Sequence, residues 1–361
     1  MIFINHDLLD LTHLRLCAGH DPKHMTMLRA DAKRAADVGC TSVIDYPGFP
    51  DNPHDYYSLA RYYHPNPETA DGLPYVSRDG ILNPSSITGP KRAMQQLAAD
   101  VLCLAVASVL IDGAYAPVIM ARLEKWFLNP QTAMRPHLNH AQAKRGINTG
   151  TAAGVIDAHI WINIVLGLEI LETCQPNDQF FGGMRDWFGR LADWLYTSDH
   201  GISARAIGNN ITAWWAAMVM VFARYGGNRH HMVDDVTHMY RDLLDTKMDR
   251  WGCFYGELGR TRSMHYNLFF LNALEVLATC GNLWGIAGRH GSVCCAIDYM
   301  MPYLQNPRIW PHPQIMKETY RGSALIAIAA RKLSRPDIGD VNNTLARPRW
   351  GDILGPTWLW I

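Results

Sequence analysis

Apolar residues recur three and four positions apart along most of the chain, which is the spacing of one face of an α-helix. From residue 91 onward this pattern is almost continuous, and short breaks rich in Gly, Pro and Asn separate one helix from the next. Alternation of apolar and polar positions, the strand pattern, is scarce. The pattern predicts helices over residues 7–40, 91–112, 114–128, 154–172, 179–197, 209–226, 229–249, 262–280, 291–304 and 314–332.

The order of these helices indicates the fold class. Neighbouring helices joined by short turns predict an all-α closed double layer, an α/α toroid, whose cleft lies at one rim. We find no tight repeat of 30 to 40 residues, so a helical-repeat solenoid is a weaker interpretation. One large toroid can accommodate all 361 residues, and we therefore expect a single domain over residues 1–361.

A long irregular stretch interrupts the helical pattern between residue 41 and about residue 90. Pro, Asp, Asn and Tyr are frequent in it, most of all between His54 and Pro67. A loop of this length in a compact protein is usually functional or disordered, and its aromatic residues argue against disorder. We expect an ordered lid or cleft wall, called the aromatic loop below.

Two further loops lie between predicted helices, over residues 129–142 and 198–210. The second ends in Asn209-Asn210, directly before a predicted helix. One asparagine suffices to cap a helix. The second favours a functional interpretation, in which amide and backbone N–H groups are presented to an anion.

Composition and charge narrow the function classes. The chain is 48% hydrophobic, which allows a sizeable core, and its 33 basic and 33 acidic residues give a formal net charge of zero. That balance argues against nucleic acid as the main partner. We find no apolar run of membrane-spanning length, so we expect no membrane partner. The 12 Trp, 15 Tyr and 16 His suit a carbohydrate cleft, although Trp is also common in helical cores.

Sequence motifs for metals and cofactors are missing. The eight cysteines include no CxxC pair, and neither HExxH nor an EF-hand loop is present. No nucleotide fingerprint occurs, so we expect neither a metal nor a cofactor. The N-terminus lacks a basic region and a small-residue cleavage site, which fits an intracellular protein or a trimmed mature chain. We expect the second, in a secreted or periplasmic protein.

The richest chemistry lies in Glu257-Leu-Gly-Arg-Thr-Arg-Ser-Met-His-Tyr266. If Arg262 opens the helix that follows, Tyr266 lies one turn on and shares its face, with Arg260 and His265 beside it. A cationic cluster that carries a phenol suits an anionic substrate and proton transfer. The alternative is structural, with an arginine paired to Glu257 and a tyrosine in the core.

Six short segments, in order along the chain, carry a family resemblance. They are His54-Asp-Tyr-Tyr-Ser-Leu-Ala with Asp71-Gly-Leu-Pro-Tyr-Val and Arg78-Asp-Gly; Leu138-Asn-His-Ala-Gln142 with Gly154-Val-Ile-Asp157; Asp193-Trp-Leu; Asn209-Asn210 with Trp214; Glu257 to Tyr266; and Trp310-Pro-His-Pro-Gln-Ile315. Together they resemble the alginate lyase domain family, which includes alginate lyases and related glucuronan-cleaving lyases. The resemblance covers about residues 50 to 320.

The resemblance implies an α/α toroid that cleaves an anionic uronate polysaccharide by β-elimination. It implies catalytic roles for Asn210, Arg260 and Tyr266, and His265 is the first histidine to test. The expected substrate-binding residues are Asn209, Arg262, Tyr62, Tyr63, His64, Asn139, His140, Gln142 and Trp214.

This chain departs from the family pattern at one catalytic position. The family commonly reads Asn-Asn-His, whereas this chain has Ile211 after the two asparagines. Tryptophans are frequent in the family where this chain has Tyr63 and His64, and a tyrosine where it has His140. Three interpretations of Ile211 are open: the site has lost activity, it uses only a syn route, or another histidine takes the place of the missing one. The candidate histidines are His265, His159, His140, His200 and His64.

β-Elimination explains why these residue types belong together. The C5 proton of a uronate is weakly acidic while the adjacent carboxylate is charged, so the enzyme must neutralise that carboxylate. In a syn elimination, one tyrosine can remove the C5 proton and protonate the leaving oxygen. Our hypothesis gives Tyr266 both tasks, with Arg260 lowering its pKa or binding the carboxylate, and Asn210 with Asn209 neutralising the carboxylate.

Two other function classes remain open from the sequence. A glycoside hydrolase on the same toroid needs two carboxylates at the scissile bond, for which Asp157, Glu257 and Asp55 are candidates. A non-catalytic glycan-binding protein is the other alternative, because Ile211 could mark an inactive site.

Overall fold

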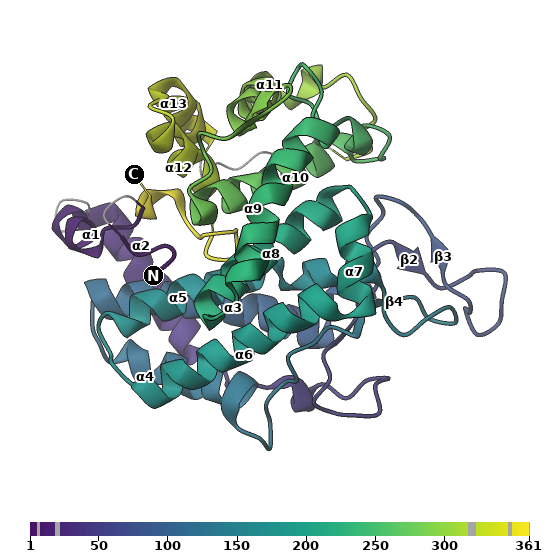
Figure 1. Cartoon of the computed structure of the whole chain (residues 1–361). Coiled ribbons are helices and arrows are strands. Elements are labelled where there is room, and N and C mark those ends of the chain that lie inside the picture. The colour runs from purple at the N-terminus through teal and green to yellow at the C-terminus, as the bar shows by residue number, and fades with distance from the viewer. Residues whose placement is uncertain (6–7, 19–21, 317–322, 346–348, 361) are drawn as a thin grey trace.

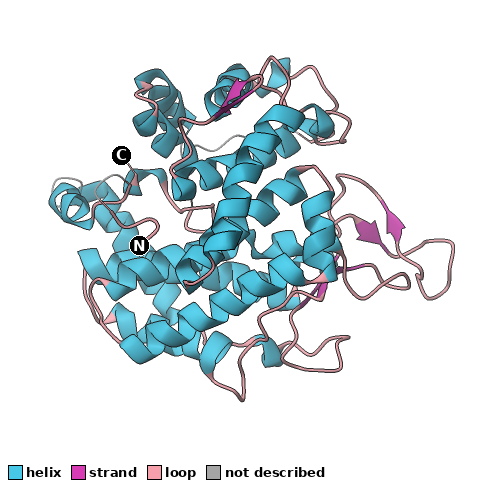
Figure 2. Ribbon diagram, in the orientation of Figure 1, coloured by secondary structure: helices cyan, strands magenta, loops and turns pink. Residues whose placement is uncertain are grey.

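Helices dominate the computed structural model, which describes residues 1–5, 8–18, 22–316, 323–345 and 349–360 (Figure 1, Figure 2). The α-helices are α1 (Leu11–Ala18), α2 (Pro22–Asp37), α3 (Gly89–Leu110), α4 (Tyr115–Leu123), α5 (Ile162–Glu172), α6 (Asp178–Thr197), α7 (Asp199–Ala206), α8 (Asn210–Gly226), α9 (His230–Lys247), α10 (Ser263–Gly281), α11 (Val293–Gln305), α12 (Ala324–Lys332) and α13 (Pro336–Leu345). The longest of the other helical segments is the 3-10 helix η4 (Ala152–Trp161). The predicted all-α class is confirmed.

Short strands form three two-stranded sheets outside the helical body. Strand β1 (Tyr57–Leu59) pairs in parallel with β4 (His140–Ala143). Strands β2 (Tyr63–His64) and β3 (Val76–Ser77) form an antiparallel pair, as do β5 (Ala287–Gly288) and β6 (Gly291–Ser292). The aromatic loop is therefore ordered, as its composition predicts.

Most predicted helices are present, and three predictions need correction. The helix predicted over residues 7–40 is divided into α1 and α2, and residues 7 and 19–21 lie outside the described part. The loop predicted over residues 198–210 contains α7, whose short and mostly polar sequence lacks a clear apolar period. Of the helix predicted over residues 314–332, only α12 is present, and residues 317–322 are not described.

Helix α8 lies at the centre of the packing. It contacts α6, α9 and α10, while α3 packs against α5 (Figure 1). Every residue from 212 to 223 is buried, so α8 is apolar on all sides and not along one stripe. That is the pattern of an interior helix. The beginnings of α8 and α10 carry the asparagine pair and the arginine–tyrosine motif, and the packing of these two helices brings the two motifs together.

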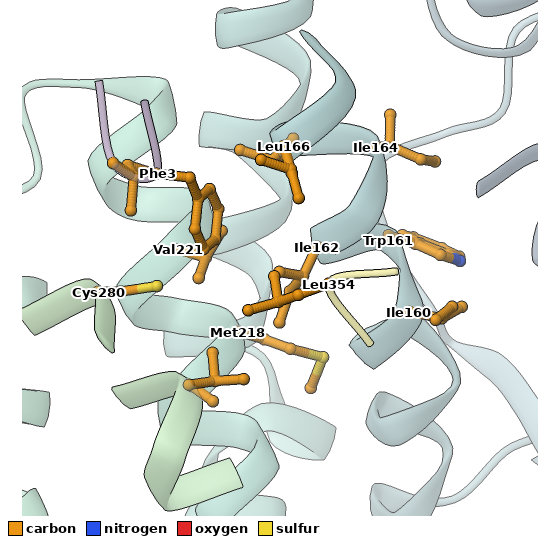
Figure 3. Close-up of a cluster of buried hydrophobic side chains, with 14 of the residues drawn as sticks. Phe3, Ile160, Trp161, Ile162, Ile164, Leu166, Met218, Val221, Cys280 and Leu354 are labelled. Carbon is orange, nitrogen blue, oxygen red and sulfur yellow. The ribbon is translucent and has the colours of Figure 1, made fainter. Parts of the chain in front are cut away.

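The core beside α8 is built from segments that are distant in the sequence (Figure 3). Met218 and Val221 of α8 lie in one cluster with Ile162 and Leu166 of α5, Cys280 of α10, and Phe3 and Leu354 from near the two chain ends. The two ends are also held by buried polar groups on α5. The Phe3 backbone N–H donates to Glu169 at 2.8 Å, and the Leu354 backbone N–H donates to Asn163 at 2.8 Å.

Among the described residues, two helical segments are long and apolar enough to span a membrane by length and composition alone. They are Gly89–Leu110, which is α3, and Ala152–Glu172, which joins η4 and α5. The sequence expectation that no apolar run reaches this length is thus wrong. In this structure 67% and 89% of their respective apolar windows are buried inside the protein.

Candidate active site

The asparagine pair caps α8 and binds an internal carboxylate. The Asn209 side-chain oxygen accepts the Ile211 backbone N–H at 2.9 Å, which is an N-cap. The Asn210 backbone N–H and its side-chain Nδ2 both donate to Glu257 Oε1, at 2.8 and 2.9 Å. The helix N-terminus therefore already holds an anion, and that anion belongs to the protein. The sequence prediction that the backbone N–H groups here are open to substrate is wrong for Asn210.

Glu257 is a buried positioning residue for Asn210. Burial raises the pKa of its carboxyl group, whereas the two hydrogen bonds from Asn210 and the charge of Arg260 lower it. Its Oε2 is buried and has no hydrogen-bond partner within the described residues. The sequence left open a structural role in which Glu257 pairs directly with an arginine. In the structure its carboxylate instead accepts hydrogen bonds from Asn210.

Arg260 is held by an aspartate from the aromatic loop. Its Nη2 lies 2.7 Å from Asp79 Oδ1, and its Nε lies 3.3 Å from Asp79 Oδ2. The Thr261 backbone N–H and hydroxyl also donate to Asp79. These bonds, with Arg260 contributing most, lower the pKa of Asp79 to about 2 despite partial burial. Arg260 is thus already half of an ion pair before any substrate arrives.

Gly80 allows this close approach of the aromatic loop. Its φ is +79°, a left-handed conformation that favours glycine. A Cβ atom at this position would lie 2.4 Å from the Thr261 hydroxyl and 2.8 Å from a methyl group of Ile315. The Arg78-Asp-Gly turn can therefore reach the arginine motif only with glycine at its end.

Tyr266 lies beneath the guanidinium of Arg260. The guanidinium carbon is 3.7 Å from the ring centroid, a cation–π contact. The Tyr62 hydroxyl is buried beside Tyr266 and makes no hydrogen bond of standard geometry within the described chain. Burial, followed by Tyr62, raises the pKa of Tyr266 well above its ordinary value, and Arg260 only partly opposes them. Arg260 thus lowers the pKa of Tyr266 as the sequence hypothesis requires, but burial and Tyr62 outweigh it, and the net direction favours the neutral phenol.

Two histidines adjoin this cluster. The ring of His265 meets Tyr266 edge-on, at a centroid distance of 5.2 Å, and stacks on Phe269 at 6.0 Å. His159 of η4 contacts Phe269 at 5.4 Å and Trp214 at 4.9 Å. Burial lowers the pKa of His159 to about 4, so its imidazole is neutral at pH 7.

Trp214 does not lie where the sequence prediction requires. Its side chain is 1% exposed and packs between His159 and Phe269. A tryptophan that contacts a sugar must present a ring face to solvent, so this ring instead supports the floor of the cluster.

The other predicted substrate-binding residues lie in or beside the short strands β2 and β4 and just before α10, with several polar atoms already engaged. Asn139 accepts from the Trp194 indole at 3.0 Å, and Gln142 donates to Asp157 at 3.0 Å. His140 Nε2 lies 3.5 Å from a carboxylate oxygen of Asp55.

The remaining predicted contacts come from β2 and the residue before α10. His64 Nε2 is 3.0 Å from the Ile81 carbonyl oxygen. Lys144 lies over the Tyr63 ring at 4.4 Å. The backbone of Arg262 pairs with Gln314 immediately before α10 begins.

A buried network anchors the aromatic loop to the helices. Asp157 accepts hydrogen bonds from Lys91 at 2.7 Å, Ser58 at 2.5 Å, Gln142 at 3.0 Å and Tyr56 at 3.2 Å. Its carboxylate is therefore fully bonded inside the protein. Asp55 and Glu257 are buried as well. A glycoside hydrolase needs two carboxylates that reach the substrate. These three carboxylates are all buried, so no two of them form such a pair.

Two functional partners were missed by the sequence analysis. Asp79 belongs to the Arg78-Asp-Gly segment that carries part of the family resemblance, but an aspartate before glycine also fits an ordinary turn. The role of Glu257 toward Asn210 is equally hidden, because 47 residues separate them. Over the described part of the chain, no group of three or more His, Cys, Asp or Glu side chains is arranged to hold a metal ion.

Comparison with known proteins identifies similar chains. The alginate lyase family model matches residues 48–310. The structure of an alginate lyase from Bacteroides ovatus superposes with a TM-score of 0.85 at 23% identity, and the match covers 95% of each chain. None of the curated proteins gives a significant match in sequence.

More distant structures share the same architecture. A variant of alginate lyase A1-III in complex with a tetrasaccharide matches with a TM-score of 0.57 at 14% identity, over 92% of this chain and 93% of that one. Alginate lyase A1-III from Sphingomonas species A1 matches with a TM-score of 0.55 at the same identity and over the same shares. The α/α toroid predicted from the sequence is confirmed.

Proposed function

The chain belongs to the alginate lyase family and is a polysaccharide lyase, and from this premise we propose that it cleaves a uronate polymer of the alginate or glucuronan type around Tyr266. The observation that carries this proposal is the contact between Arg260 and the phenol of Tyr266 at 3.7 Å, beside the Asn209–Asn210 pair. β-Elimination requires a group that transfers protons and groups that stabilise negative charge. A phenol next to a fixed cation, with amides close by, supplies both.

Tyr266 is the proton donor in this proposal. Expulsion of the C4 oxygen leaves negative charge on that oxygen, which a neutral phenol can protonate. Because burial raises the pKa of Tyr266, its proton is present over the whole neutral range. Arg260 lies on the ring face and stabilises the phenolate that forms when the proton leaves.

Amides neutralise the uronate carboxylate in this proposal. Arg260 is paired with Asp79, so its charge is already partly balanced. The Asn209 side-chain nitrogen makes no hydrogen bond to any described residue, and Asn209 is only half-buried at the start of α8. We assign the Asn209 amide to the carboxylate, while Asn210, held by Glu257, fixes the start of the helix beside it. Fixed amides stabilise developing charge without reorganising.

The test is an assay on a panel of polymers. Glucuronan, polymannuronate, polyguluronate and a hyaluronan-type glycan are mixed with the protein, and the ultraviolet absorbance of the new C4–C5 double bond is followed. We expect a rise on at least one polymer, and Tyr266→Phe should lower that rate by about 10²- to 10⁴-fold. Tyr115→Phe, at the start of α4, is the matched control. No absorbance on any polymer with new reducing ends instead would contradict a lyase, and full activity in Tyr266→Phe would contradict its role.

A further inference from the structure

β-Elimination needs a proton acceptor, and the resting state of Tyr266 does not supply one. The phenol of Tyr266 is protonated, and its raised pKa keeps it so. Two nearby carboxylates are also unsuited. Asp79 is occupied by Arg260 and Thr261, and the open oxygen of Glu257 is shielded from solvent. The acceptor must therefore come from another group near the cluster.

His159 lies under both catalytic motifs. A side chain on a helix covers the turn that precedes its own Cα atom. Trp214 therefore covers the turn of α8 that carries Asn210, and Phe269 covers the turn of α10 that carries Tyr266. The His159 ring contacts both of these aromatic rings, at centroid distances of 4.9 and 5.4 Å. This geometry places its imidazole on the floor between the asparagine pair and the phenol.

The environment of His159 fixes which nitrogen can accept a proton. Nδ1 lies 2.6 Å from the Ile156 carbonyl oxygen, and only a protonated Nδ1 can donate to that oxygen. Nε2 then carries the lone pair, and it makes no hydrogen bond to any described residue. His159 as a whole residue is partly buried.

Burial is the main reason that this tautomer is neutral in the resting protein. Burial lowers the pKa of His159 most and Lys91 and Arg61 lower it further, while the hydrogen bond to Ile156 and the charge of Asp157 raise it. Arg61 precedes Tyr62, whose hydroxyl adjoins Tyr266, so the segment that carries this phenol also brings a positive charge near His159.

We propose that Nε2 of His159 first takes the C5 proton of the uronate, and that Tyr266 then gives its proton to the departing C4 oxygen. The electron pair of the C5–H bond is held first as an enolate-type carbanion on C5 and the neutralised carboxylate; it then forms the C4–C5 double bond as the pair of the C4–O bond leaves with the oxygen. The enzyme is left with an imidazolium and a phenolate, which exchange protons with solvent to restore the resting state. This inference rests on the proposed function. It divides between His159 and Tyr266 the two proton transfers that the sequence hypothesis gives to Tyr266 alone.

Deuterium exchange separates the two proton transfers. Wild type, Tyr266→Phe, His159→Asn and His265→Gln are each incubated with the responsive polymer in D₂O, and uncleaved chains are analysed for deuterium at C5. Tyr266→Phe retains the acceptor, so it should exchange C5 protons without cleaving the polymer. His159→Asn keeps a donor for Ile156 and lacks the imidazole lone pair. It should neither exchange nor cleave, with a rate loss of about 10²- to 10⁴-fold.

The outcomes distinguish this inference from the proposed function. No unsaturated product from wild type on any polymer would overturn the proposed function itself. If wild type is active, His159→Asn with a rate near wild type would overturn only the role of His159. Absence of exchange in Tyr266→Phe would return both proton transfers to Tyr266. Loss of exchange in His265→Gln but not in His159→Asn would move the acceptor to His265. Equal thermal midpoints of wild type and His159→Asn exclude misfolding as the cause of lost activity.

Discussion

At the scale of single residues, Asp79 shows how the site is assembled from distant parts of the chain. It is 181 residues from Arg260, yet its carboxylate fixes the guanidinium over Tyr266. The pKa of Asp79 is lowered to about 2, mainly by Arg260. A carboxylate whose pKa is lower in the folded state stabilises that state above its unfolded pKa and loses the effect as pH falls.

Asp79→Asn should therefore lower thermal stability near pH 7, and the difference from wild type should shrink as pH falls from about 4 to about 2. Above pH 5 the difference should be constant, because Asp79 is fully ionised in both states there. Thermal unfolding followed by circular dichroism at several pH values measures this. Asp71→Asn, in the exposed part of the same loop, is the control and should show no such dependence. A difference that persists unchanged at pH 2 would contradict the ion pair.

At the scale of elements, the beginning of α8 depends on Glu257. Two donors of Asn210 are buried against one oxygen of this carboxylate. Glu257→Leu removes their acceptor, and each unpaired buried donor costs about 1–3 kcal/mol. Glu257→Gln retains a carbonyl oxygen for both donors, so its free energy of unfolding should fall much less than that of Glu257→Leu. Urea unfolding of the two variants gives the comparison, and equal midpoints would show that Asn210 does not need this acceptor.

Elements differ in how well the sequence predicts them. Helix α6 follows from apolar spacing, because its buried residues recur every three to four positions. Helices α3, α8 and α10 are buried over most of their length, so their long apolar runs, ended by Gly, Pro or Asn, carry the prediction. Helix α7 was missed because its eight residues carry little apolar signal. The segment from Glu257 to Tyr266 stands out because its chemical groups adjoin in sequence, and its catalytic role stays a prediction. The pairings of Asp79 with Arg260 and of Glu257 with Asn210 could not, because packing of distant segments creates them.

At the scale of the whole molecule, the helical body buries a further carboxyl group, on α10, that the proposed chemistry does not use. Glu275 of α10 is 0% exposed, and neither of its oxygens has a hydrogen-bond partner in the described part of the protein. Burial raises its pKa to about 8 from an ordinary value of 4.5. The folded protein therefore carries Glu275 as a neutral acid at pH 7, whereas the unfolded chain carries it ionised.

Glu275 makes the stability of the fold fall as pH rises. Between pH 4.5 and about 8 the folded state binds a proton that the unfolded state has lost, so the free energy of unfolding decreases over this window and levels off above it. Glu275→Gln does not ionise and should not show this decrease. At 1.36 kcal/mol for each pKa unit, the variant should gain on the order of 3 kcal/mol over wild type between pH 4.5 and 7. Chemical denaturation across this range measures the difference, and a difference independent of pH would show that Glu275 is not held neutral by burial.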